Sequence, residues 1–192
     1  MGKLSWKPGN MLYPLPVVLV TVANRQGEQN IFTVAWAGTV CSDPPMVSIS
    51  VRPSRHSYAM IQESGCFVIN ITTEKLVRAA DYCGVVSGRD VDKFEKMGLT
   101  LGKADKVEAS LLLESPVNLE CQVESVIPLG THDMFVAKVV AVHVEDSLLD
   151  KNNKFHLNQA YPVVYSHGSY LSLGRELGTF GYSVRKKKGR KK

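Results

Sequence analysis

The chain has 192 residues, of which 44% are hydrophobic, and its formal net charge is +5. This length suffices for one well-buried globular domain, and no apolar run is long enough to span a membrane. The N-terminus also lacks the basic start, apolar run and small-residue cleavage site of a signal peptide, so we expect a cytoplasmic protein.

The first predicted element is a strand over residues 17–23. An irregular lead-in rich in proline, glycine and aromatic residues precedes it over residues 6–16. A polar turn that contains Gly27 follows over residues 24–30. The chain therefore opens with one strand and a turn before its chemically informative part begins.

The next predicted strand spans residues 33–41 and consists mostly of small residues, among them Ala35, Ala37, Gly38 and Thr39. Small side chains let a flat ligand approach the backbone closely. They also suit a strand that packs tightly beneath a helix, and the composition fits both interpretations equally.

The strand predicted over residues 46–52 has one apolar and one polar face. Val47, Ile49 and Val51 alternate with Ser48, Ser50 and Arg52. Because successive side chains of a strand point to opposite faces, one face should border the core and the other something polar.

A helix N-terminus is predicted directly after this strand. A short helical pattern follows Pro53 and ends at Gly65. The positive end of the helix dipole, together with the donors of Arg52, Ser54, Arg55 and Ser57, suits a phosphate. Two exposed arginines could also be merely solvated. Beside a small-residue strand, however, the corner suggests a phosphorylated planar cofactor.

Two helical segments are predicted further along the chain. Thr73 can cap a helix over residues 74–83 with Gly84 as its stop, and the apolar stripe of that helix consists of Leu76, Ala79, Ala80 and Cys83. The segment 87–98 reads as a loop entering a short helix. Here Lys93 could meet a phosphate or a ring carbonyl, and Phe94 could cover an aromatic face. Alternatively, Phe94 packs into the core and Lys93 is solvated.

A long antiparallel hairpin is predicted from the alternating strand 117–124, the turn 128–133 and the strand 134–144. His132 stands in the turn. A loop histidine is usually a polar surface residue, but beside a redox cofactor it could orient a nicotinamide or donate a proton. Residues 161–173 read as a final strand and its return. These elements favour one mainly β domain over residues 1–184, a β-barrel with short peripheral helices.

Several classes of site are excluded by pattern. The four cysteines are spread without a C-x-x-C pair and three lie in apolar patterns, so buried free thiols fit better than disulfides, a zinc site or an iron–sulfur site. Neither G-x-G-x-x-G nor G-x-x-x-x-G-K-[ST] occurs, so there is no Rossmann fingerprint and no P-loop. Seven basic residues lie in the last eight, 185–192, which we expect to be a disordered tail.

Four segments together resemble the flavoredoxin branch of the flavin reductase-like proteins: residues 30–70, SGRDVDKF at 87–94, NLEC at 118–121 and GTHD at 130–133. The resemblance implies an FMN-binding split barrel that forms a homodimer, with each flavin near the subunit interface. It implies that residues 35–41 line the flavin ring, that the arginines and serines of the corner hold the phosphate, and that Lys93 and Phe94 close over the cofactor.

The sequence and the resemblance together give two sets of candidate site residues. The cofactor-binding candidates are Thr33, Ala35, Trp36, Ala37, Thr39, Val40, Cys41, Arg52, Ser54, Arg55, Ser57, Lys93 and Phe94, and the catalytic candidate is His132. The expected function is that of an FMN-dependent oxidoreductase to which NADH or NADPH binds transiently, or which a redox partner protein reduces. The alternative is a nucleic-acid-binding barrel that uses the basic tail. It is disfavoured because the basic residues are not interleaved with aromatic residues on strands.

Overall fold

The computed structural model describes residues 1–185, so the predicted tail lies, except for Arg185, outside the described residues. The main feature is an antiparallel seven-stranded sheet in the order β3-β2-β6-β9-β10-β5-β4. Its strands are β2 (Val18–Ala23), β3 (Gln29–Val34), β4 (Ala37–Ser42), β5 (Pro45–Val51), β6 (Cys66–Ile71), β9 (Val117–Pro128) and β10 (Asp133–Val144).

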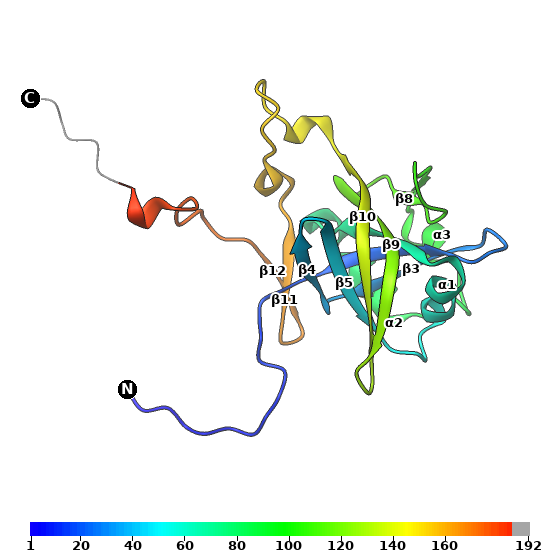
Figure 1. Cartoon of the computed structure of the whole chain (residues 1–192), viewed down its shortest axis with the longest axis horizontal. Coiled ribbons are helices and arrows are strands. Elements are labelled where there is room, and N and C mark those ends of the chain that lie inside the picture. The colour runs from blue at the N-terminus through cyan, green and yellow to red at the C-terminus, as the bar shows by residue number, and fades with distance from the viewer. Residues whose placement is uncertain (186–192) are drawn as a thin grey trace, which may run out of the picture.

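The sheet must curl, because its two edge strands β3 and β4 are joined by only Ala35 and Trp36. Six spacings of about 4.8 Å would place the edges of a flat sheet about 29 Å apart. The three Cα–Cα steps from Val34 to Ala37 span at most about 11 Å. The sheet therefore wraps into a barrel with helices on its outside (Figure 1), which confirms the predicted fold class.

The continuous strand predicted over residues 33–41 is wrong. β3 pairs with β2 and β4 pairs with β5, so the chain crosses from one edge of the sheet to the other at Ala35 and Trp36. The small residues thus turn a corner of the barrel. β4 is also not packed beneath a helix, since Val40 is 51% exposed.

The barrel interior is filled by the inward side chains of the strands and by side chains of one helix. The predicted alternation on β5 is confirmed, because Val47, Ile49 and Val51 are all buried in this core. Helix α1 (His56–Ser64) adds Met60 and Ile61. It ends at Gly65, whose φ of 67° lies in the left-handed region, as the sequence predicted.

A second core lies between the outer face of β2 and β3 and helix α2 (Val77–Val85), which a 3-10 turn (Glu74–Leu76) precedes. The predicted apolar stripe of this helix is buried. Gly84 does not end the helix, which continues to Val85. Instead, a Cβ at position 84 would lie 3.3 Å from the Cβ of Thr33, so the glycine allows close packing on β3. Thr73 precedes the first turn but makes no capping side-chain bond.

The remaining elements surround the barrel. They are β1 (Leu15–Pro16), α3 (Lys93–Met97), β7 (Leu101–Gly102), β8 (Leu111–Leu112), β11 (Val163–Ser166), β12 (Ser169–Ser172) and 3-10 turns at Asp146–Leu148, Leu157–Ala160 and Tyr182–Val184. β1, β11 and β12 form a small sheet, and the N-terminal end of the chain and the segment after β12 extend away from the barrel (Figure 1).

The long hairpin of β9 and β10 is confirmed, with a turn between Pro128 and Asp133. The polar side chains of Asn118 and Glu120 on β9 are nevertheless buried, since the segment around β7 and β8 contacts both of them. The four cysteines are free thiols, three of them buried, as predicted. No helix in residues 1–185 combines the length and apolar character that a membrane span requires.

Candidate functional site

The end of β5 and the start of α1 form the predicted corner. Arg52 follows β5 directly, Arg55 occupies the position before the first helical residue, and the Arg55 N–H donates to the Arg52 carbonyl at 3.0 Å. Both guanidinium side chains are exposed, and neither forms an ion pair with a carboxylate in the described part of the chain. Two cationic groups are thus available beside a helix N-terminus.

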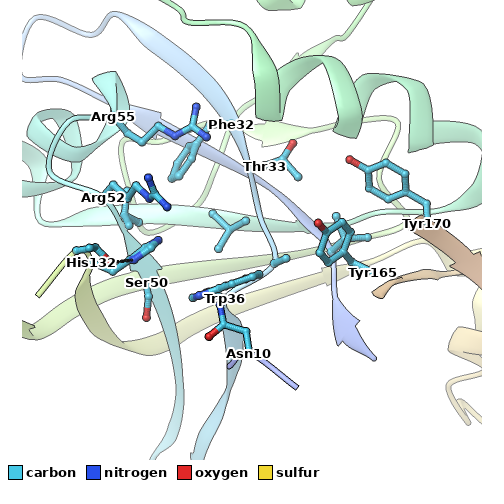
Figure 2. Close-up of a pocket in the computed structure, with 15 residues that line it drawn as sticks. Asn10, Phe32, Thr33, Trp36, Ser50, Arg52, Arg55, His132, Tyr165 and Tyr170 are labelled. Carbon is cyan, nitrogen blue, oxygen red and sulfur yellow. Dashed lines mark hydrogen bonds between the residues drawn. The ribbon is translucent and has the colours of Figure 1, made fainter. Parts of the chain in front are cut away.

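A cavity of about 580 Å³ opens beside this corner. Figure 2 shows Arg52, Arg55 and His132 on one side of it and Tyr165 and Tyr170 on the other, with Trp36 between. The corner of β3 and β4 supplies the nearby backbone through Thr33, Val34, Ala35 and Trp36. We call this space the large cavity.

A second space of about 290 Å³, the small cavity, shares Phe32, Arg52 and Arg55 with the large cavity. Its lining contains four arginine and lysine residues, Arg52, Arg55, Arg89 and Lys93, as well as His56, and no carboxylate. Such a concentration of positive charge favours an anion. The two adjoining cavities together suit a molecule that joins a flat ring system to a phosphate.

Lys93 contributes a buried charge to this region. Its side chain is only 3% exposed, and its Nζ donates to the Ile31 carbonyl at 2.6 Å and to the Cys83 carbonyl at 3.2 Å. Burial lowers the pKa of Lys93; Cys83 opposes the shift and Arg55 reinforces it. The solvated alternative for Lys93 is therefore wrong. An anion in the small cavity would offset this poorly solvated charge.

Ser57 and Asn30 fix the floor of the small cavity. Ser57 is buried, and its hydroxyl accepts a hydrogen bond from Asn30 Nδ2 at 2.8 Å. A Cβ at position 88 would lie 2.2 Å from Asn30 Oδ1, so only glycine fits at Gly88. The loop that carries Arg89 therefore passes close to Asn30 at the small cavity.

His132 lies in the turn of the long hairpin and lines the large cavity. Its Nδ1 is 2.9 Å from the Thr131 hydroxyl, and its ring stacks on Trp36 with 6.4 Å between centroids and 17° between planes. Burial lowers the pKa of His132, and the charges of Arg52 and Arg55 lower it further. This shift favours the neutral imidazole.

The structure brings most of the candidates together but not all of them. Thr33, Ala35, Trp36 and His132 line the large cavity, Ser54, Ser57 and Lys93 line the small one, and Arg52 and Arg55 line both. Ala37 and Gly38 line a neighbouring cavity and not the large or the small one, and Thr39, Val40, Cys41 and Phe94 line none of these three. β4 turns away after Trp36, and Phe94 packs against the outer core, as its alternative predicted.

Sequence reasoning missed several residues of the site. Asn10, Asn30, Phe32, Arg89, Tyr165 and Tyr170 line the two cavities. Tyr165 and Tyr170 face each other edge-to-face at 5.8 Å. Burial and the nearby Asp81 carboxylate, to which its hydroxyl donates, raise the pKa of Tyr170 to about 12. Only the density of polar residues around Arg89 could have been noticed in the sequence.

The chain resembles known proteins in sequence and in fold. The family model described as flavin reductase like domain matches residues 10–174. Flavoredoxin of Desulfovibrio vulgaris (Miyazaki F) is 32% identical and superposes with a TM-score of 0.89 over 96% of this chain and 100% of that one.

Two relatives are similar to this chain in sequence. A protein of Aeropyrum pernix without an assigned function is 30% identical over 156 residues, which are 81% of this chain and 58% of that relative. The NADH-dependent FMN reductase AsuE2 of Streptomyces nodosus subsp. asukaensis is 26% identical over 173 residues, 90% of this chain and 85% of that protein.

Proposed function

Because this chain belongs to the flavin reductase-like family, we propose that it binds FMN and works as a flavoprotein oxidoreductase. One observation carries the proposal. The small cavity, with four arginine and lysine side chains and no carboxylate, joins the large cavity at Arg52 and Arg55. A ligand with its phosphate in the small cavity and its flat ring in the large cavity would occupy both spaces.

The residues present fit FMN. Arg52, Arg55 and Arg89 would hold its phosphate together with the hydroxyls of Ser54 and Ser57. The buried ammonium of Lys93, which no described carboxylate neutralises, supports an anion at this place. When bound, FMN would supply the hydride and electron chemistry.

His132 would orient a nicotinamide in the large cavity. Its lowered pKa makes it a poor proton donor near pH 7, whereas a neutral imidazole can still accept or donate one hydrogen bond. Thr131 and Trp36 hold the ring in place. We therefore favour orientation over proton donation, the two roles that the sequence left open.

The electron donor that we propose first is NADH or NADPH, bound transiently because the sequence has no Rossmann fingerprint. Similarity to an NADH-dependent FMN reductase supports it. A redox partner protein is the second candidate, supported by the similarity to flavoredoxin. The nucleic-acid alternative depended on the tail, which lies largely outside the described residues.

We expect the protein to retain FMN after desalting and so to keep the visible absorption of the flavin. In the absence of oxygen, NADH or NADPH should bleach this absorption. The His132→Ala variant should retain the same amount of FMN but be reduced more slowly, by about two- to tenfold, the value of one ordinary hydrogen bond. Anaerobic stopped-flow absorbance measures both quantities.

Each result bears on a different part of the proposal. A protein that emerges from desalting colourless, after incubation with excess FMN, would contradict stable cofactor binding. Retained FMN that neither nucleotide reduces would instead favour the partner protein as donor. An unchanged reduction rate in the His132→Ala variant would remove the orienting role of the imidazole.

A further inference from the structure

A third cavity, of about 550 Å³, lies on the other side of Trp36 from the arginine corner. It shares Asn10, Trp36 and Ser50 with the large cavity. The N-terminal segment 9–13 forms one wall, and the start of β4 with Ser48 of β5 forms the other. We call it the N-terminal cavity. Figure 2 shows Asn10 beside Trp36 at the boundary between the two spaces.

The lining of the N-terminal cavity has a different chemistry from the small cavity. Met11, Leu12 and Leu15 are apolar, Tyr13 and Trp36 are aromatic, and the polar groups are amides and hydroxyls; none of the lining residues has a charged side chain. A charged ligand would lose hydration here without gaining a partner charge. A neutral aromatic ligand would gain from burial and ring contacts.

Each wall of this cavity has a fixed point. Ser50 N–H donates to the Trp36 carbonyl at 2.8 Å, which fixes the backbone beside the indole. The ring of Tyr13 packs at 4.1 Å from that of His167, and Leu15 pairs with Tyr165 across β1 and β11. From Tyr13 onward the segment is thus attached to β11 and to the turn that follows it.

We infer that the N-terminal cavity is the binding site for a second substrate of small, uncharged, aromatic character, placed beside the space that FMN would occupy. The inference rests on the proposed function only for the identity of the neighbouring ligand. The two sites would then differ in the charge of what they bind: anionic groups bind at the arginine corner, and neutral rings bind between Trp36 and the N-terminal segment.

Gly38 offers a way to fill this cavity selectively. It lines the N-terminal cavity but not the large or small one. A Cβ added there meets no atom within 4 Å, so the Gly38→Leu variant should fold. The next residue on β4, Thr39, is exposed and lines none of the three, which makes Thr39→Leu the matched control.

The probes are benzamide and benzoate, which share a shape and differ in charge. The chain has two tryptophans, so Trp6→Phe leaves Trp36 as the single fluorescent indole. In this background we expect benzamide to quench Trp36 and to bind at least about tenfold more tightly than benzoate. Gly38→Leu should weaken benzamide binding by about tenfold or more, and Thr39→Leu should leave it within about twofold.

The titrations are run with and without FMN, and FMN affinity is measured for each variant. Gly38→Leu should leave FMN affinity unchanged. The inference is overturned by equal affinity for the two probes, by no benzamide binding up to its solubility limit, or by equal effects of Gly38→Leu and Thr39→Leu. If the expected benzamide pattern appears in a protein that binds no FMN, the N-terminal site stands and the proposed function fails.

Discussion

Replacing Glu120 with leucine is expected to lower the free energy of unfolding by roughly 3 to 5 kcal/mol. The carboxylate is fully buried, and it accepts backbone N–H donors from Asp105 at 2.8 Å, Lys106 at 2.6 Å and Val107 at 3.1 Å. His143 Nε2 lies 2.6 Å from it. Leucine would leave all four partners without an acceptor. Urea denaturation measures the change.

Gln122→Leu is the matched control, because Gln122 lies two residues further along β9 and is exposed. Its effect should stay within about 0.5 kcal/mol. Equal unfolding midpoints for Glu120→Leu and Gln122→Leu would contradict the role of the buried carboxylate.

The same carboxylate predicts how stability depends on pH. Burial raises the pKa of Glu120, but the Asp105 N–H, His143 and the Lys106 N–H outweigh it and hold the pKa below its usual value of 4.5. A group whose pKa is lower in the folded chain stabilises the fold fully at a pH above its usual pKa. This stabilisation is lost as the pH falls through the lowered pKa. Below about pH 4.5 the free energy of unfolding of the native chain should therefore fall as the Glu120 carboxylate is protonated. The Glu120→Gln variant has no carboxylate at this position and should not show this part of the decrease.

The hydrogen bonds of this cluster support a structural role. The ligand atoms of Asp105, Glu120 and His143 lie within 4.8 Å of one another. The oxygens of Glu120, however, are already occupied by three amides and an imidazole. The carboxylate thus ties the loop before β8 to the barrel wall.

Removing both arginines of the corner should have the largest effect on the cofactor. The double variant Arg52→Ala, Arg55→Ala is expected to lose roughly 3 to 6 kcal/mol of FMN binding free energy, because each charge-assisted contact contributes about 1.5 to 3 kcal/mol. This corresponds to an affinity lower by a factor of about 10² to 10⁴. Quenching of FMN fluorescence on titration with protein measures it.

Arg78→Ala is the control, since Arg78 is an exposed arginine of α2 that lines neither cavity. Both guanidinium groups of the corner are exposed, so the double variant should keep its unfolding midpoint. A double variant that binds FMN as tightly as Arg78→Ala would show that the two arginines are merely solvated.

The features that could be predicted from the sequence depend on neighbours along the chain. The alternation of Val47, Ile49 and Val51 follows from the two-residue period of a strand. The stop at Gly65 follows from the freedom of glycine to adopt a positive φ. The arginine corner was found for the same reason, because a strand end and a helix start lie next to each other in sequence.

The features that were missed depend on the barrel as a whole. The break at Ala35 and Trp36 arises because β3 and β4 lie at opposite edges of the sheet, which no local pattern encodes. Tyr165 and Asn10 come to the large cavity from opposite ends of the chain. Lys93 is buried because α3 packs its first residue against carbonyls of Ile31 and Cys83, although lysine side chains are rarely buried.

The most direct test compares the affinities of the protein for FMN and for riboflavin, which has the same ring system and no phosphate. If the arginine corner holds the phosphate, FMN should bind at least about a hundredfold more tightly, a difference of about 2.7 kcal/mol. Added salt should reduce this difference, because it screens the exposed guanidinium groups. Equal dissociation constants for the two flavins would contradict the assignment of the corner.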